Sequence, residues 1–504
     1  MDSLVPLFLI IPLGIAFIIP LAWRFIQGFY RYLPAAGMLA MVVMAFNMLF
    51  SLQGESIEYM VGGWQPVDNI PIGISLIADP LSLMMLIVVN MIGLMAGLFS
   101  IPYIDKYTGE NYYYSLFSLM VAGMNGVVLT GDLFNMFVFL EVSVIASYAL
   151  VAFGSSRDEL EASFKYQVLG GIASMLILFS LAMTYWYTGT LNIADVSLVL
   201  RSDTGSNTTL FIQLFMIAGF GLKAAMIPFH AWLPDAHSSA PSPVSAMLSG
   251  VLIKAIGVYA ILRLFFSMFE MSVEMGWVIT SIGALSMVLG VILAIGQWDM
   301  KRLLAYHSIS QMGYVMTASG IAMVVTASGG DPGVAALALA GGLFHMFNHA
   351  FFKGLLFLNA GALEYSTGTR NLKELGGLQD LMPVTSLTNL GASLSISGIP
   401  PFNGFFSKLI IIIAAVKGKF YFLALLAVIV SIITLASFMK VQRYAFLDRL
   451  KSPKLAKVKE VPFLMTLPMI VMAIMCLAMS LMIIPGIRDT FLMDAVNTLL
   501  SKIS

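Results

Sequence analysis

The chain has little of what a water-soluble protein needs, because only 10% of its 504 residues are charged. Soluble domains carry roughly 25% charged residues, so the composition excludes a water-exposed surface over most of the chain. Its one cysteine, Cys476, excludes a disulfide framework, and no Cys/His cluster indicates an iron–sulfur, zinc or haem site. We therefore expect no cofactor. A formal net charge of zero also gives no reason to expect nucleic acid as a partner.

What the chain does have is hydrophobic residues, at 59% of the total, arranged in long runs separated by short polar gaps. Runs of about 18 to 25 apolar residues can each cross roughly 30 Å of hydrocarbon as a helix. The sequence therefore predicts an all-α integral membrane protein with about fourteen transmembrane helices. The expected spans are 4–22, 33–52, 76–100, 112–130, 133–153, 163–186, a broken seventh near 219–246, then 243–266, 275–295, 304–327, 334–358, 381–416, 420–438 and 462–484.

The charged residues in the gaps predict the orientation in the membrane. The loop after the second span carries Glu55, Glu58 and Asp68 but neither lysine nor arginine. Because lysine and arginine concentrate on the cytoplasmic side, this loop and the amino terminus are expected outside. By the same reasoning, Lys301 is counted with the inside gaps, and Arg263, near the end of the span expected at 243–266, is counted with the outside ones.

Two spans are interrupted. In the stretch GFGLKAAMIPFHAWLPDAHSSAPSPVSA, Pro228 follows Lys223 and removes a backbone donor, so we expect a break in a helix that contains Lys223. In the twelfth span the stretch GIPPFNGFF precedes Lys408. The breaks lie five spans apart, so the two segments run in opposite directions, as an inverted pair of five-helix repeats requires. This predicts discontinuous helices 7 and 12 and four parts, 1–111, 112–268, 269–445 and 446–504.

Several titratable residues fall inside the expected spans. Glu141 follows Asp132 by about 13 Å of helix, which places it near mid-membrane. Lys223, Lys254 and Lys408 also lie within spans, and each such charge costs roughly 2.5–3.5 kcal/mol unless it is paired or hydrated. A chain that keeps them is expected to use them in an ion pathway.

The eleventh span carries a polar stripe, because His345, His349 and Lys353 recur at every fourth residue and share one helix face. Ser249 lies about one turn before Lys254. Four further residues are expected to cap helices or to line the mouths of the pathway; they are Asp132, His230, His237 and His307.

Structural alternatives remain for each of these groups. Glu141 and Lys223 could form an ion pair that only fixes helix packing. Lys254, Lys353 and Lys408 could each extend toward the headgroups, which is the preferred interpretation for Lys353. The two histidines could simply satisfy neighbouring backbone.

The stretches TGDLFNMFVFLEVSVIASYAL, GLKAAMIPFHAWLPDAHSSAPSPVSAMLSGVLIKAIGVY, FHMFNHAFFKGLLFLNAG and SGIPPFNGFFSK closely resemble the antiporter-like subunits of complex I, Mrp sodium/proton antiporters and membrane-bound hydrogenases. The resemblance covers nearly the whole chain. It implies a fourteen-helix core with inverted repeats, in a multi-pass protein of a prokaryotic cell membrane that assembles with other membrane subunits. It also implies a proton pathway of Glu141, Lys223, Lys254, His345, His349 and Lys408.

Within the family, GDLFNMFVFLEV is most similar to the Mrp D-type subunit, and Lys408 differs from the glutamate of some complex I members. The resemblance thus implies proton translocation that supports sodium/proton exchange. A redox-driven ion-pumping subunit of a hydrogenase or of complex I is the alternative. An enzyme acting alone is a third possibility, although the sequence shows no cofactor or nucleophile constellation.

Overall fold

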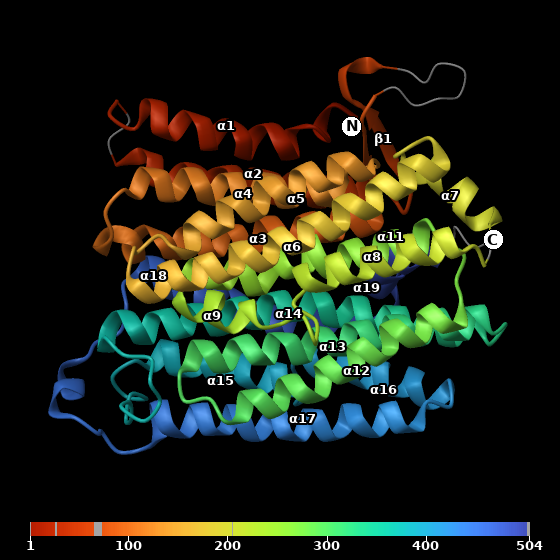
Figure 1. Ribbon diagram of the computed structural model, residues 1–504. Helices are drawn as coiled ribbons and strands as arrows, with labels where there is room; N and C mark the ends of the chain where they lie inside the picture. The colour runs from red at the N-terminus through yellow and green to blue at the C-terminus, as the bar shows by residue number, and fades with distance from the viewer. Residues whose placement is uncertain (1, 26–27, 65–72, 204, 501–504) are drawn as a thin grey trace.

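The computed structural model describes residues 2–25, 28–64, 73–203 and 205–500, so Asp68 lies outside the described residues. Long helices run side by side, with α1 and α17 at opposite edges (Figure 1). Twelve helical segments of the described part are long and apolar enough to cross a membrane. They comprise α1 (Leu7–Ala22), α2 (Leu33–Leu52), α3 (Pro80–Tyr103), α4 (Glu110–Leu129), α5 (Leu133–Val151), α6 (Arg157–Thr188), the composite Ser242–Ser267, α12 (Val273–Ile295), α13 (Met300–Ala327), α14 (Pro332–Thr367), α17 (Tyr421–Gln442) and α18 (Phe463–Ala478).

The composite segment Ser242–Ser267 departs from regular α-helix. It begins as α10 (Ser242–Met247), continues through the π-helical turns η5 (Leu248–Leu252) and η6 (Lys254–Tyr259), and ends as α11 (Ala260–Ser267). Such π-helical turns are rare and are frequent at functional sites. Lys254 lies at the start of the second one.

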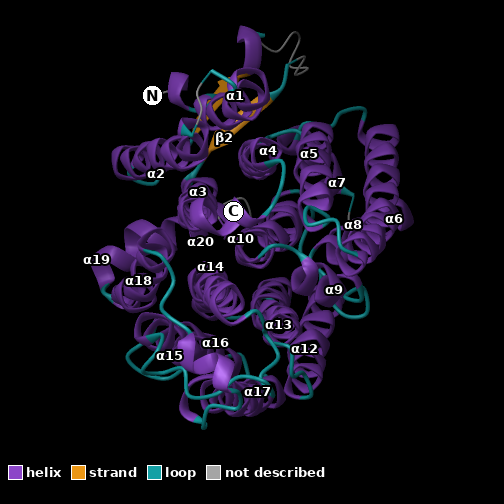
Figure 2. Cartoon of the chain, turned by 90° about the vertical axis from the view of Figure 1, so that its left-hand side faces the viewer, coloured by secondary structure: helices purple, strands orange, loops and turns teal. Residues whose placement is uncertain are grey.

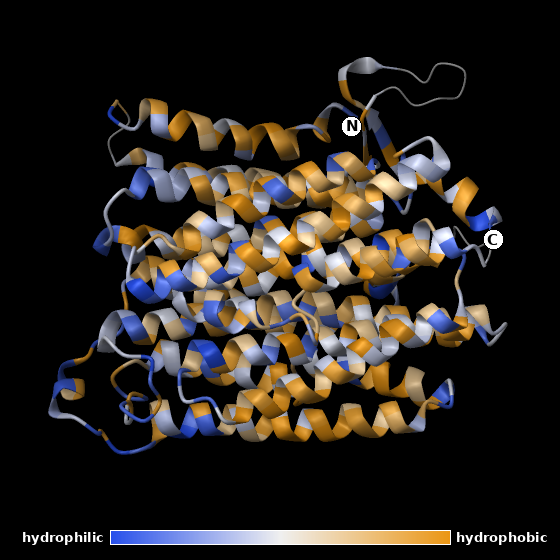
Figure 3. Cartoon of the chain, in the orientation of Figure 1, coloured by the Kyte–Doolittle hydropathy of each residue, from blue (hydrophilic) through white to orange (hydrophobic). Residues whose placement is uncertain are grey.

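Helices at the centre and at the edge of the bundle bury different faces. In the end-on view, α10 and α14 are surrounded by the other helices (Figure 2). Apolar side chains on the outer helices are exposed, among them Phe17, Trp186 and Phe422. Hydrophilic residues gather toward the loops at the helix ends (Figure 3). An apolar outer surface suits a protein whose surroundings are hydrocarbon.

The first interruption separates α8 (Asn207–Lys223) from α9 (Trp232–Ser239). The expectation that Lys223 lies within a helix broken at Pro228 is wrong in detail, because Lys223 is the last residue of α8. Ala225 has a positive φ of 53° and the helix has already ended there. The indole of Trp232 donates to the carbonyl of Leu222 at 3.0 Å, which satisfies an acceptor freed at the helix end.

The second interruption separates α15 (Pro383–Ser397) from α16 (Asn403–Lys417). Gly398 ends α15 with φ of 77°, a conformation that glycine adopts without strain. Lys408 lies in the second turn of α16, after its break, as the sequence predicts.

The described chain is helical apart from its loops and one antiparallel pair of strands, β1 (Ile57–Met60) and β2 (Ser75–Ala78), with Ile57 opposite Ala78. The predicted start of the third span is wrong, because residue 76 belongs to β2. The helix α3 begins at Pro80, where Asp79 and Ser82 form a capping box. The remaining short α-helices are α7 (Ile193–Ser202), α19 (Pro485–Arg488) and α20 (Asp494–Leu500).

Two basic residues expected in polar gaps are buried instead. Arg263 lies in α11 and pairs with Asp79 at 2.6 Å. Lys301 lies in the first turn of α13, 1% exposed, and its ammonium donates to the carbonyl of Ala240 just after α9. The hydropathy of the sequence places the helix ends but does not reveal which basic residues fold inward from them.

Candidate functional site

A three-residue cluster joins α5, α6 and α8. The ammonium of Lys223 lies 3.4 Å from Glu141 Oε1 and donates to the hydroxyl of Ser174 at 2.9 Å. That hydroxyl in turn lies 2.5 Å from Glu141 Oε1. The side chain of Lys223 is 1% exposed and that of Glu141 is 25% exposed. The structure therefore brings the predicted pair together and adds Ser174, which no sequence signal distinguishes from the other serines of the sixth span.

Lys254 is completely buried, so its interpretation as a side chain that extends to the headgroups is wrong. Its ammonium donates to the carbonyl oxygens of Ser249, at 2.7 Å, and of Gly250. The Ser249 hydroxyl bonds instead to that of Ser308 at 2.6 Å. Because π-helical geometry alters the ordinary backbone pairing, these carbonyls can accept from the lysine.

The polar stripe of α14 lies in the centre of the bundle. His345 contacts Ser407 through Nδ1 at 3.0 Å and Gln311 through Nε2 at 3.2 Å. His349 is equally buried, but neither of its ring nitrogens has a hydrogen-bond partner among the described residues. The structural alternative, in which the two histidines only hydrogen-bond to neighbouring backbone, is therefore wrong. Gln311 was not identified as a site residue from the sequence, although a polar amide within the expected tenth span could have indicated it.

Lys353 is fully buried, and its ammonium donates to the carbonyl of Leu304 at 2.5 Å. The preferred interpretation, in which Lys353 reaches the headgroups, is therefore wrong. Several further turns of α14 follow this residue before the helix ends at Thr367, and they keep it within the bundle.

Lys408 is 3% exposed and donates to the carbonyl of Ile396, in the last turn of α15, at 2.8 Å. A cation at a helix carboxyl end is favoured by the helix dipole. The ammonium also lies 4.9 Å from the ring centroid of Tyr314, which lies 5.5 Å from the ring of His345. Tyr314 thus links two predicted pathway residues.

Four further residues were expected to cap helices or to line the mouths of the pathway; they are Asp132, His230, His237 and His307. Asp132 caps α5 by accepting from the amide of Asn135 at 2.7 Å, as predicted, and burial raises the pKa of this carboxyl. His230 lies partly buried in the break after α8, whereas His237 and His307 are fully buried and do not lie at a mouth. His307 contacts the Ser437 hydroxyl at 2.8 Å.

The predicted pathway residues fall into two groups in the structure. Glu141 and Lys223 form one group together with Ser174. Lys254, Lys353, Lys408 and the two histidines of α14 form the other, and all of them are buried. Between the groups, η6 packs directly on the end of α8, since a Cβ on Gly257 would lie 2.6 Å from Cα of Ala224. The close backbone approach holds the two groups as neighbours.

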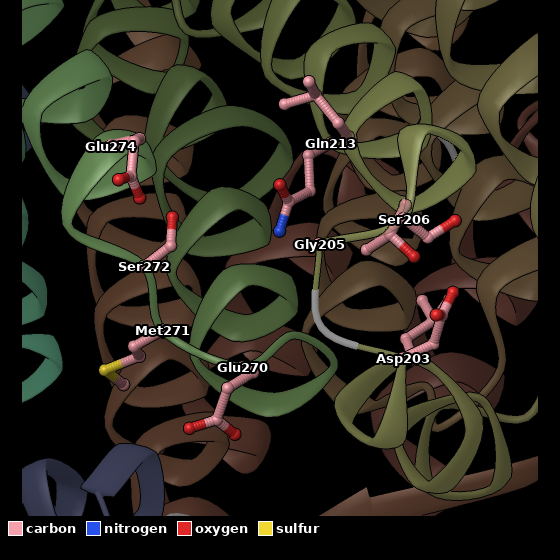
Figure 4. A pocket seen from close by; sticks show the side chains of 11 residues that line it. Asp203, Gly205, Ser206, Gln213, Glu270, Met271, Ser272 and Glu274 are labelled. Carbon is pink, nitrogen blue, oxygen red and sulfur yellow. The ribbon is translucent and has the colours of Figure 1, made fainter.

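Cavities open at the bundle ends and beside Lys408. One of about 320 Å³ lies between the start of α8 and the start of α12, and Gln213, Asp203, Glu270 and Glu274 line it (Figure 4). Another, of about 200 Å³, lies between α16 and α17 and includes Lys408. Among the described residues no three His, Cys, Asp or Glu side chains are placed to hold a metal ion.

Together these features define a multi-pass helical membrane protein whose interior carries lysines and histidines between two interrupted helices. The family described as "NADH:quinone oxidoreductase/Mrp antiporter, TM" matches residues 130–434, and "NADH-Ubiquinone oxidoreductase (complex I), chain 5 N-terminus" matches residues 64–114. The chain therefore belongs to the family of antiporter-like subunits found in complex I and Mrp antiporters, which confirms the resemblance in the sequence.

Individual relatives agree with this assignment. The chain is 35% identical over 464 residues to the N subunit of the NADH-quinone oxidoreductase of Desulforudis audaxviator, covering 90% of this chain and 89% of that one. It is 34% identical over 451 residues to the D subunit of the Na(+)/H(+) antiporter of Alkalihalophilus pseudofirmus, covering 88% and 87%. It matches a chain in the structure of the Mrp complex from Dietzia sp. DQ12-45-1b with a TM-score of 0.88 and 26% identity, over 99% and 97% of the two chains.

Proposed function

We propose that this chain is the proton-translocating D-type subunit of a multisubunit Mrp-type sodium/proton antiporter. The observation that carries the proposal is the cluster of Glu141, Ser174 and Lys223 at the end of the interrupted helix α8. A carboxylate, a hydroxyl and an amine within hydrogen-bond reach can exchange a proton, and ionisable groups inside a membrane bundle mark ion pathways. The similarity to the antiporter relative of Alkalihalophilus pseudofirmus, over most of both chains, supports the same function.

In this proposal protons pass along residues that cross the bundle from α5 to α16. Lys223 exchanges with Glu141, and Lys254, His345 and His349 connect it to Lys408. The contacts of Tyr314 with both His345 and Lys408 support the last connection. Lys353 and His237, which are both fully buried, would form a branch of this pathway.

The finer architecture belongs to the same proposal. Twelve apolar segments, together with the interrupted pairs α8/α9 and α15/α16, would make fourteen crossings. We assign the inverted five-helix repeats to 112–268 and 269–445, with 1–111 and 446–504 as flanking parts. The partners would be other membrane subunits in a prokaryotic cell membrane.

The test is sodium/proton exchange by the assembled complex in membrane vesicles. Glu141→Ala and Lys223→Ala should each abolish exchange while the complex still assembles. Glu161→Ala and Lys165→Ala are matched controls, because this pair near the start of α6 is about half exposed and should leave exchange unchanged. Normal exchange by both Glu141→Ala and Lys223→Ala would refute the assigned roles.

A redox-driven pump is the second candidate, because the identity to the NADH-quinone oxidoreductase relative is as high as that to the antiporter relative. In that case the same residues would conduct protons in response to a quinone-reacting or hydrogen-reacting module. Co-purification with iron–sulfur subunits, and quinone reduction by the purified complex, would favour it over the antiporter.

A further inference from the structure

Ser174 stands between the two charged groups of the cluster. The direct contact from Lys223 Nζ to Glu141 Oε1 is 3.4 Å, whereas charge-assisted N–H···O bonds are about 2.7–2.9 Å. Through the serine hydroxyl the two steps are 2.9 Å and 2.5 Å. The shorter connection between lysine and glutamate therefore runs through Ser174.

The same hydroxyl has a second acceptor in its own helix. The carbonyl oxygen of Gly170 lies 2.9 Å from Ser174 Oγ. A hydroxyl has one proton to donate and two lone pairs that accept. When Glu141 is ionised, its carboxylate is the stronger acceptor, so it accepts the hydrogen bond from the serine hydroxyl. When Glu141 is protonated, its own O–H can donate to Ser174 Oγ, which leaves the serine hydroxyl free to donate to the carbonyl of Gly170.

We propose that Ser174 is a proton bridge between Lys223 and Glu141, an inference that rests on the function proposed above. In the transfer, an N–H bond of the Lys223 ammonium breaks and a new O–H bond forms on Ser174 Oγ. The original O–H bond of Ser174 breaks, and its proton forms an O–H bond on Glu141. The products are a neutral amine, an unchanged serine hydroxyl and a neutral carboxylic acid, so proton count and charge balance.

Because the Ser174 hydroxyl can donate either to Glu141 or to Gly170, its orientation can set the direction of proton transfer. Once Glu141 is neutral, rotation of the serine hydroxyl toward Gly170 points its proton away from the Lys223 amine, so the proton cannot return through Ser174. The proton is then held on Glu141 instead of returning to the lysine. Loss of the hydroxyl should therefore slow transfer and alter how exchange depends on pH.

The experiment compares variants of Ser174 in the intact complex, with exchange measured in vesicles across pH. The side chains introduced by Ser174→Thr and Ser174→Val have nearly the same shape, but only threonine keeps a hydroxyl. We expect the threonine variant to remain within about threefold of the unchanged protein, and the valine variant to lose at least about tenfold with a shifted pH profile. Ser174→Ala should behave like valine, and if it fails to assemble, the threonine–valine pair still decides.

Ser180→Ala is the matched control. Ser180 is a buried serine of the same helix whose hydroxyl donates to the carbonyl of Ile177, so exchange should not change. Equal exchange and equal pH profiles for Ser174→Val and Ser174→Thr would overturn the bridge.

The outcome separates the two proposals. If Glu141→Ala and Lys223→Ala abolish exchange while Ser174→Val exchanges normally, only the bridge is wrong. If the glutamate and lysine variants also exchange normally, the proposed function itself is wrong.

Discussion

The guanidinium of Arg263 lies 2.6 Å from the carboxylate of Asp79, with the two side chains only 8% and 7% exposed. Asp79 also caps α3, so this one carboxylate joins the start of α3 to α11. The hydroxyl of Tyr259, one turn away, accepts from Arg263 Nε at 3.2 Å and donates to the carbonyl of Val128 at 2.7 Å. The contact ties the amino-terminal helices to the segment that carries Lys254.

Asp79→Asn should therefore destabilise the protein. The asparagine can still cap α3, but it leaves the Arg263 charge buried and uncompensated, at a cost of about 3–5 kcal/mol. Thermal unfolding of the purified complex measures the loss. Asp105→Asn is the control, because Asp105 pairs with Arg31 at an exposed position and should cost at most about 1 kcal/mol. Equal unfolding temperatures for the two variants would contradict the prediction.

Gly404→Ala should disrupt the second interruption. A Cβ at Gly404 would lie 1.9 Å from the backbone oxygen of Ser395, so α16 could no longer approach the end of α15. We expect a loss of about 1–3 kcal/mol and a lower yield of folded protein. At Gly391, within α15, a Cβ would meet its nearest neighbour at an ordinary 3.7 Å, so Gly391→Ala should be neutral or slightly stabilising. The idea fails if both alanines have the same effect.

The Lys408→Glu variant should still exchange sodium for protons, and its exchange rate should fall as the pH rises. The protonated acid can donate to the carbonyl of Ile396 as the ammonium does, whereas the ionised carboxylate brings two acceptors together at the end of α15. Lys408→Arg keeps the donor but cannot release a proton, so its exchange should be low at every pH between roughly 6 and 8. Exchange by the glutamate variant that rises with pH would contradict this account.

Lys353→Met should reduce exchange by at least about tenfold, because the buried ammonium lies on the same face of α14 as His345 and His349 and donates to the carbonyl of Leu304. Methionine keeps most of the volume, so packing changes little. Lys373→Met removes an exposed lysine near Trp298 and should leave the rate unchanged. Vesicle assays at equal complex abundance compare the two. Equal rates would place Lys353 outside the pathway.

Much of the architecture was predictable from the sequence. Apolar runs predicted most of the spans to within a few residues, such as 33–52 for α2. Pro228 and the Pro400–Pro401 pair marked both interruptions, because proline cannot donate to a helix. One error is at residue 76, where a short apolar segment forms a strand instead of the start of a helix. The other is at Lys223, where the helix ends several residues before the proline.

By itself the sequence determined which segments leave water and which titratable residues go with them, because transfer of long apolar runs into hydrocarbon depends only on local composition. The tertiary structure decided which faces meet. Helices that are apolar on every side give no signal of their neighbours, so the place of Ser174 beside Glu141 could not be predicted. The depth of Lys301 and Lys353 was also decided there, because burial of a long side chain depends on the helices packed around it.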